Sequence, residues 1–169
     1  MTEATEQETT GDEGLLPDLR AQAEHATAAC DPDLVGLVQV ANAYGLETDV
    51  VLTVSGQVLA GTLVSGRTYF AGLADAVQGD DPADTVRGAL AARYRRRAGE
   101  FEGWGEGSTL GDLDPDGPED DRLSALPRVA YLHLRDARLV SGHRLPLWRG
   151  RIADVVGWTA GSLQGGSTG

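Results

Sequence analysis

Lysine is absent from this chain, so all 14 of its basic residues are arginines. Cys30 is the only cysteine, which excludes an intramolecular disulfide and a zinc site built from several cysteines. Aromatic residues make up only 5% of the sequence, so aliphatic side chains must supply most of a core. No apolar run reaches the roughly 18 residues that a membrane-spanning helix requires.

The charge of the chain limits its partners. The formal net charge is −12 and the sequence pI is about 4.5, which disfavours broad binding to phosphate backbones. The polar, acidic N-terminus has the features of neither a signal peptide nor a transit peptide. We therefore expect a cytoplasmic protein without a membrane segment, and we do not expect nucleic acid as a partner.

The composition predicts one domain with decorated ends. A length of 169 residues fits a single domain, and a hydrophobic content of 41% is enough for a core. We expect an acidic, mostly disordered tail over 1–30, the domain over 31–163 and a flexible Gly/Ser tail over 164–169. Within the domain we expect a helical insertion over 66–98 and an acidic loop over 99–121, which contains nine acidic residues and no basic one.

Local signals predict a helix followed by a hairpin. Asp31-Pro32 is typical of a helix start, and Gly45 is typical of a helix end. Residues 49–65 read as two strands around the turn Ser55-Gly56-Gln57. Gly61, inside the second strand, indicates a bend or a close backbone approach.

The rest of the domain contains a further helix start and two late strands. Asp81-Pro82 repeats the combination of cap and proline inside the insertion. Alternation over 129–134 predicts a strand with His133 on its polar side, and Asp136-Ala137 is expected to turn the chain. A second strand is expected from 147 to about 160, with glycines as bend points.

An N-terminal helix followed by five short, bent strands favours an α+β fold. We expect a small, closed or half-open five-stranded β-barrel, with the helical insertion between the second and third strands. Three segments resemble the strands of an Sm-like barrel: Val50-x-Leu52-x-Val54-x-Gly56-x-Val58-x-x-Gly61-x-Leu63, Leu132-His-Leu134-x-Asp136-Ala137 and Leu147-Trp-Arg149-Gly150-x-Ile152.

The acidic loop contains half of a calcium-binding pattern. Asp112-Leu-Asp114-Pro-Asp116-Gly117 matches the first positions of a calcium loop, but Leu123 occupies the position that needs a bidentate carboxylate. We interpret residues 112–123 as a solvated acidic loop, and weak calcium binding stays open.

No motif predicts catalysis. His133 and His143 lack a nearby carboxylate pair, which disfavours a metal site. A grouping of His133 with Ser141 and Asp136 has no nucleophile-elbow sequence to support it. We therefore expect no catalytic residue, metal or cofactor.

Tryptophans and arginines are candidates for contacts. Trp148 and Trp158 flank the last strand, and a packing role is favoured for them over a ligand platform. Arg149 and Arg151 share one strand face, where they either hold a carboxylate of a neighbouring chain or are solvated. The arginine run at 93–97 suits the end of a helix dipole, and it either pairs with the acidic loop or is solvated separately.

Three segments, in order, resemble the gas vesicle accessory protein U family. They are Leu59-Ala-Gly61-Thr62-Leu63-Val64-Ser65-x-x-x-Tyr69-Phe70, Leu132-His133-Leu134-Arg135-Asp136-Ala137 and Leu147-Trp148-Arg149-Gly150-Arg151-Ile152-Ala153-Asp154-Val155-Val156-Gly157-Trp158. The resemblance extends from about Leu34 to Leu163. It implies a non-enzymatic role, in which the protein acts on assembled gas vesicles, including their clustering.

The residues and the resemblance together lead to one functional hypothesis. We expect a homo-oligomer at the gas vesicle surface that contacts the shell or other gas vesicle proteins and acts on vesicle assembly or clustering. An Sm-like RNA-binding protein is the alternative, because Arg149-Gly150 stands where such proteins contact nucleotides. The candidate interface residues are Tyr69, Phe70, Trp148, Arg149, Arg151 and Trp158.

Overall fold

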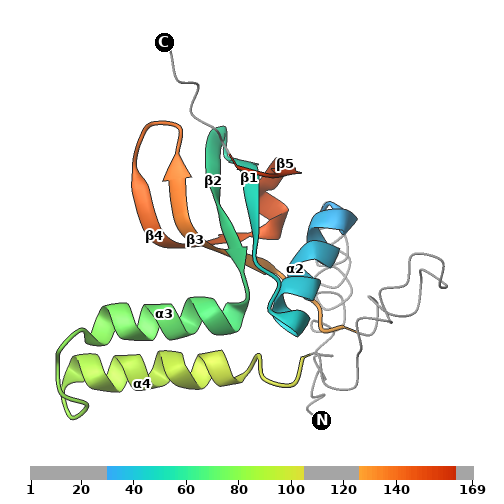
Figure 1. Cartoon of the computed structure of the whole chain (residues 1–169). Helices are drawn as coiled ribbons and strands as arrows, with labels where there is room; N and C mark the ends of the chain where they lie inside the picture. Colours follow the sequence, from blue (N-terminus) through green and yellow to red (C-terminus); the bar gives the residue numbers. More distant parts are fainter. Residues whose placement is uncertain (1–29, 105–125, 163–169) are drawn as a thin grey trace, which may run out of the picture.

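Three α-helices and a five-stranded sheet make up the described part of this α+β protein (Figure 1). The computed structural model describes residues 30–104 and 126–162. The predicted N-terminal tail except Cys30, the C-terminal tail, most of the acidic loop and the partial calcium motif lie outside the described residues. The elements in chain order are α2 (Pro32–Tyr44), β1 (Thr48–Val54), β2 (Gln57–Val64), α3 (Gly66–Gln78), α4 (Val86–Gly99), β3 (Tyr131–Leu139), β4 (Arg144–Arg151), a 3-10 helix (Ile152–Asp154) and β5 (Val155–Ala160). None of the helices described has both the length and the apolar character needed to cross a membrane.

Helix α2 begins and ends where the sequence predicts. The side chain of Asp31 accepts hydrogen bonds from the backbone N–H groups of Asp33 and Leu34, which would otherwise lack partners at the helix start. Gly45 ends the helix in the left-handed conformation, with a φ of 69°. These two local signals therefore fix the length of the helix.

The predicted hairpin is confirmed as β1 and β2. Ser55 and Gly56 form its two-residue turn, with φ values of 51° and 76°. Positive φ at both central positions gives the turn whose twist matches that of the flanking strands. The hairpin register follows from this turn, with Val54 opposite Gln57.

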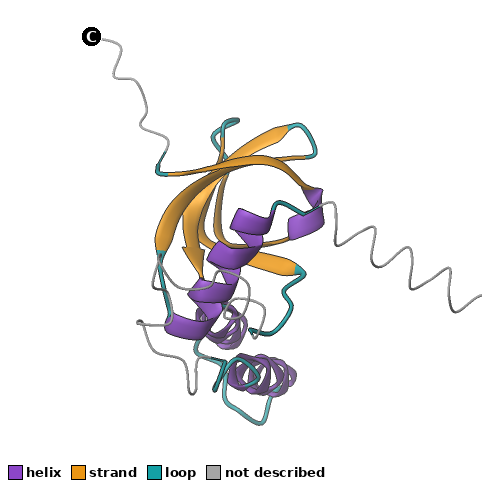
Figure 2. Cartoon of the chain, turned by 90° about the vertical axis from the view of Figure 1, so that its right-hand side faces the viewer, coloured by secondary structure: helices purple, strands orange, loops and turns teal. Residues whose placement is uncertain are grey.

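The five strands form one antiparallel sheet in the order β4-β3-β2-β1-β5. Figure 2 shows that the strands are strongly curved. The sheet is not closed, because no ladder joins β4 to β5 within the described residues, so the closed form of the predicted barrel is wrong. The 3-10 helix between these strands carries the chain from one edge of the sheet to the other, and Ile152 anchors it in the core at 1% exposure.

Strand β3 continues through the position where the sequence predicts a turn. Asp136 has a φ of 53°, and the pairing of β3 with β2 shifts by one residue opposite Gly61. The predicted turn at Asp136-Ala137 is therefore wrong, since a β-bulge absorbs the extra residue and the strand goes on. The close approach predicted at Gly61 is confirmed, because a Cβ there would lie 3.0 Å from the Cα of Ala137.

The main core lies between α2 and one face of the sheet. Alternate residues of the strands and one side of α2 fill it with aliphatic side chains, as the low aromatic content predicts. Its buried members are Leu34, Val38, Ala41, Val50, Leu52, Leu59, Leu63, Leu132, Leu134, Ala137 and Ile152. Trp148 and Trp158 pack against this core while they remain partly exposed.

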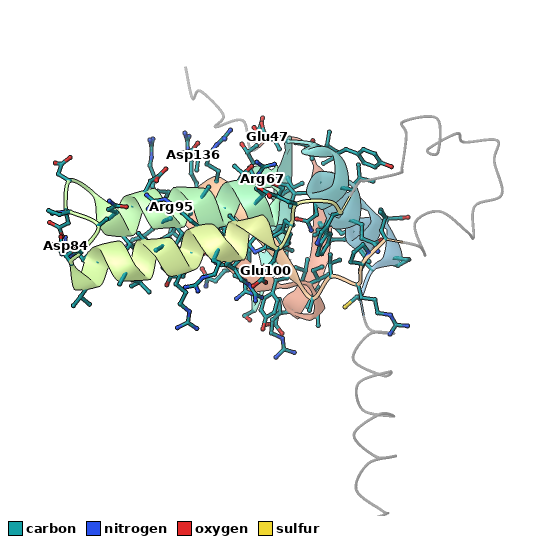
Figure 3. All side chains as sticks on the ribbon, turned by 90° about the horizontal axis from the view of Figure 1, so that it is seen from below. Glu47, Arg67, Asp84, Arg95, Glu100 and Asp136 are labelled. Atoms are coloured by element: carbon teal, nitrogen blue, oxygen red, sulfur yellow. The ribbon has the colours of Figure 1, made fainter. Side chains whose placement is uncertain are left out.

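Helices α3 and α4 form a hairpin that packs against β3 and β4. Figure 3 shows the two helices side by side, with Asp84 at the free tip of the hairpin. Aromatic residues concentrate where this hairpin meets the sheet and form a second cluster. Its buried members are Val64, Tyr69, Phe70 and Ala98, and Leu73, Tyr94, Phe101 and Leu147 pack against them.

Side-chain oxygens begin both helices of the hairpin. The Ser65 hydroxyl accepts a hydrogen bond from the backbone N–H of Thr68 at 3.1 Å, and the Thr85 hydroxyl accepts one from Gly88 at 3.0 Å. The predicted helix start at Asp81-Pro82 is wrong. The hydroxyl of Thr85 donates to the carbonyl of Pro82 at 2.7 Å, so these residues form a turn before α4.

Two glycines of α4 provide a matched test of how the hairpin is held. We expect Gly88→Ala to lower the free energy of unfolding by about 1–3 kcal/mol. The cause is steric, because a Cβ at Gly88 would lie 2.5 Å from the backbone oxygen of Ala83. Gly99→Ala should be neutral or slightly stabilising, since nothing lies within 4 Å of a Cβ there and alanine reduces the entropy lost on folding. Urea denaturation measures both, and equal effects at the two sites would contradict this packing.

Candidate functional site

An arginine-lined groove lies between the end of α4 and strands β3 and β4. Two adjoining cavities of about 460 Å³ and about 330 Å³ form it, and Arg97, Glu100 and Arg149 line both. Figure 3 shows Glu100 at the end of α4 opposite Asp84. We call this feature the arginine groove, and its charged lining residues are Arg93, Arg96, Arg97, Glu100, Arg128 and Arg149.

The arginine groove is positive although the chain carries a net charge of −12. Five arginines against one glutamate leave it a formal charge of +4. Arg97 and Glu100 form an ion pair at 2.9 Å. The ion pairs of the described part of the chain leave Arg93, Arg96 and Arg128 without a carboxylate partner.

Aromatic rings hold Arg149 in place. The central carbon of its guanidinium lies 3.6 Å from the ring centroid of Tyr131 and 5.8 Å from that of Phe70. The pairing of β3 with β4 places Arg149 opposite His133. A guanidinium can stack on a ring and still direct its N–H donors toward an anion, so this arrangement suits arginine better than lysine.

His133 lies beneath the groove at 3% exposure. Its ring packs against Tyr69, Phe70 and Phe101 at centroid distances of 4.7, 5.7 and 6.2 Å. The pKa of His133 is lowered from 6.5 to about 4, mainly by burial and in addition by the charges of Arg149 and Arg97. The prediction of a polar, outward position for His133 is wrong, because the α3–α4 hairpin covers that face of β3.

Two buried polar side chains of the smaller cavity have unpaired nitrogen atoms. Neither ring nitrogen of His133 has a hydrogen-bond partner among the described residues. Asn42 accepts a hydrogen bond from the backbone N–H of Gly66 at 2.7 Å, but its amide nitrogen has no partner in the same set of residues. A buried donor without a partner costs about 1–3 kcal/mol. An acceptor that entered the cavity would therefore be favoured.

The chemistry of the arginine groove suits anion binding. Within residues 30–104 and 126–162, no group of three or more His, Cys, Asp or Glu side chains could hold a metal ion. The surrounding arginines also repel cations. Ser141 lies beside His143, with 3.1 Å between its hydroxyl and Nδ1, rather than beside His133, so the grouping of Ser141 with His133 does not form.

Strand β5 is a second exposed feature. In the part that the structure describes, it pairs only with β1, so its outer edge is open. It has no charged residue, and Val156 is 77% exposed. The opposite edge, β4, contains three arginines and Pro146, which are features that hinder pairing with another chain.

The comparison with protein families assigns the chain. The model of the family described as "Gas vesicle protein GvpU-like" matches residues 31–163. The chain belongs to this family. Searches of curated proteins and of solved structures find no match. Membership implies a gas vesicle-associated protein, and the family is not a known enzyme family. The comparisons do not support the RNA-binding alternative.

The structure of this GvpU-like protein divides the predicted interface residues into two groups and one separate residue. Tyr69 and Phe70 are 8% and 7% exposed and lie under the arginine groove, beside the exposed Arg149. Trp148 and Trp158 pack against the main core. The remaining residue, Arg151, is exposed, and it forms an ion pair with an aspartate three residues later at 3.8 Å.

Each tryptophan has a local packing role. The indole of Trp148 covers Gly150, since a Cβ on this glycine would collide with the ring. The pKa of Asp31 is lowered first by the backbone N–H of Leu34 and next by the side chain of Trp158, so Trp158 lies near the start of α2. Trp104 donates from its indole N–H to the carbonyl of Glu100 at 3.0 Å, which supports a packing role for it.

The sequence analysis did not predict that these arginines line one groove. The arginines of 93–97 suit the end of a helix dipole and could pair with the acidic loop, but Arg93, Arg96 and Arg97 also have the spacing of a single helix face. That spacing could have identified the α4 side of the groove. Arg128 lies 31 residues after Arg97 in sequence, and no local pattern connects them.

The buried His133 predicts a specific pH dependence of stability. Its pKa is about 4 in the folded state and 6.5 as a model value, so the unfolded state binds the proton first as the pH falls. The contribution of neutral His133 to the free energy of unfolding is therefore fully present above about pH 6.5. The free energy of unfolding then decreases by about 2–3 kcal/mol towards pH 4. His133→Phe should flatten this part of the curve, measured by urea denaturation at several pH values. His143→Phe, at an exposed histidine, is the control, and an unchanged curve in the His133 variant would contradict the assignment.

Proposed function

We propose that this protein acts on the assembly or clustering of gas vesicles, without catalysis, by associating with itself and with the vesicle surface in the cytoplasm. The match to the GvpU-like family over residues 31–163 is the observation that carries the proposal. This match covers every described helix and strand, and Cys30 is the one described residue that lies outside it. The expected partners are the shell or other gas vesicle proteins.

Strand β5 supports self-association. An open edge strand offers unpaired backbone N–H and C=O groups, and soluble proteins usually protect such edges with charges or proline. Strand β5 has neither, whereas β4 has both. Two copies that pair through β5 would continue the antiparallel sheet and cover the exposed Val156.

The strand order also favours an Sm-like arrangement. A helix precedes β1, the order is β4-β3-β2-β1-β5, and the strands are strongly bent (Figure 2). In this arrangement the outer edge of β5 is available for contacts between copies. Self-association multiplies weak contacts with a vesicle, and because the chain is strongly charged these contacts should depend on salt.

Flotation tests the vesicle contact. Purified gas vesicles are mixed with the full chain and floated, and we expect the protein in the floating layer, in an amount that changes with salt concentration. An unrelated acidic protein of similar size is the control. If the chain stays in the subnatant at every salt concentration, the proposed vesicle contact is wrong.

A pair of exposed valines tests the role of β5. Val156→Arg should weaken self-association at least about tenfold, because it places charge beside the open edge. Val140 is 71% exposed outside the strands, so Val140→Arg is the matched control and should leave association unchanged. Sedimentation velocity over a range of concentrations measures both variants. The β5 interface is refuted if the chain without substitutions is monomeric at all concentrations, or if the two substitutions have equal effects.

A further inference from the structure

We propose that the arginine groove binds a multivalent oxyanion, whose phosphate or carboxylate groups lie across its two cavities. The site is built by α4, β3 and β4 and uses no residue of β5. The proposal therefore stands independently of vesicle binding and of self-association.

Charge is the first argument for an anion. The groove has a formal charge of +4, and Arg97 and Arg149 line both of its cavities. A single anion that spans the cavities would meet both guanidinium groups. Each guanidinium offers a planar fork of donors that matches two oxygens of a carboxylate or phosphate.

The buried, unpaired nitrogen atoms are the second argument, and they are independent of the charge. His133 and Asn42 are 3% and 7% exposed, and both line the smaller cavity. The amide nitrogen of Asn42 and both ring nitrogens of His133 lack partners among the residues that the structure describes. An oxyanion in the cavity would supply the acceptors that buried N–H groups require.

The walls of the groove strengthen such contacts. Phe101, Trp104 and Tyr131 line the smaller cavity, and Tyr131 holds Arg149 by stacking at 3.6 Å. Aromatic walls exclude water, so the interaction between opposite charges is less screened than on an open surface. Because the ring holds Arg149 in position, less side-chain entropy is lost when it binds an anion.

The direct test is calorimetry of the full chain with tripolyphosphate and with citrate, at constant ionic strength maintained with sodium chloride. We expect saturable binding of at least one of these anions. Arg97→Gln and Arg149→Gln should each weaken it about tenfold or more. Arg144→Gln, on the exposed start of β4 and outside the groove, removes the same charge and should leave the affinity unchanged.

Two outcomes would overturn the proposal. Absence of saturable binding would do so, and so would an Arg144→Gln effect as large as that of Arg97→Gln, which would indicate attraction by the whole surface. Arg97 is exposed, so its variant should fold even if the loss of the stacked Arg149 disturbs the sheet. Circular dichroism checks the fold of each variant.

A nuclear magnetic resonance titration of His133 provides a local readout. An anion between Arg97 and Arg149 offsets the two positive charges that lower the pKa of this histidine, so bound anion should raise that pKa. Asn42→Ala should reduce the affinity without removing any charge. A His133 titration that is identical with and without saturating anion would show that the anion binds elsewhere.

A further variant distinguishes whether the oxyanion is a free anion or a carboxylate of the chain itself. Residues 105–121 contain seven carboxylates, which can be changed to the corresponding amides. If this variant binds tripolyphosphate more tightly than the unchanged chain, carboxylates of the chain itself compete for the site. If the affinities are equal, a free anion is the source. Both results retain the site, whereas loss of binding in this variant would refute it.

Discussion

Strand β3 is packed on both of its faces, and the positions of the other elements depend on this double burial. Leu132 and Leu134 enter the main core beneath α2, and both are completely buried. His133, between them, faces the aromatic cluster of the α3–α4 hairpin. A strand with layers on both sides holds the sheet and the helical hairpin in a fixed relation. The arginine groove forms because the C-terminal end of α4 lies beside β3 and β4, where the hairpin packs on the sheet.

Local signals predicted those parts of the fold whose causes are local. The caps of α2 and the turn between β1 and β2 depend on neighbouring residues, and the sequence predicts them correctly. The course of β3 depends on distant residues. A bulge at Asp136 faces Gly61 in another strand, so a local turn signal could not reveal that the strand continues. The face of His133 likewise depends on whether a helix covers it, and alternation within a strand carries no information about that.

The same limit explains what was predicted of the candidate site. Arg149 was identified from its own strand, but its function as a groove residue depends on Tyr131 across the ladder and on Arg97 from α4. Arginine is suited to this position because its planar group stacks on a ring while its donors stay available. The net charge of the whole chain does not predict the local charge of this surface. A molecule with a charge of −12 can still present a local charge of +4 when the fold brings five arginines together.

The sheet order separates the two exposed features of the molecule. The arginine groove uses β3 and β4, whereas β5 pairs at the other end of the strand order, after β2 and β1. No residue that lines the groove belongs to β5, so the two surfaces depend on different side chains. Only the three residues of the 3-10 helix, Ile152–Asp154, separate β4 from β5, and the buried Ile152 fixes how the two strands meet. A substitution in β5 that leaves Ile152 in place should therefore leave the groove intact, because the core holds β4 independently of the edge that β5 presents.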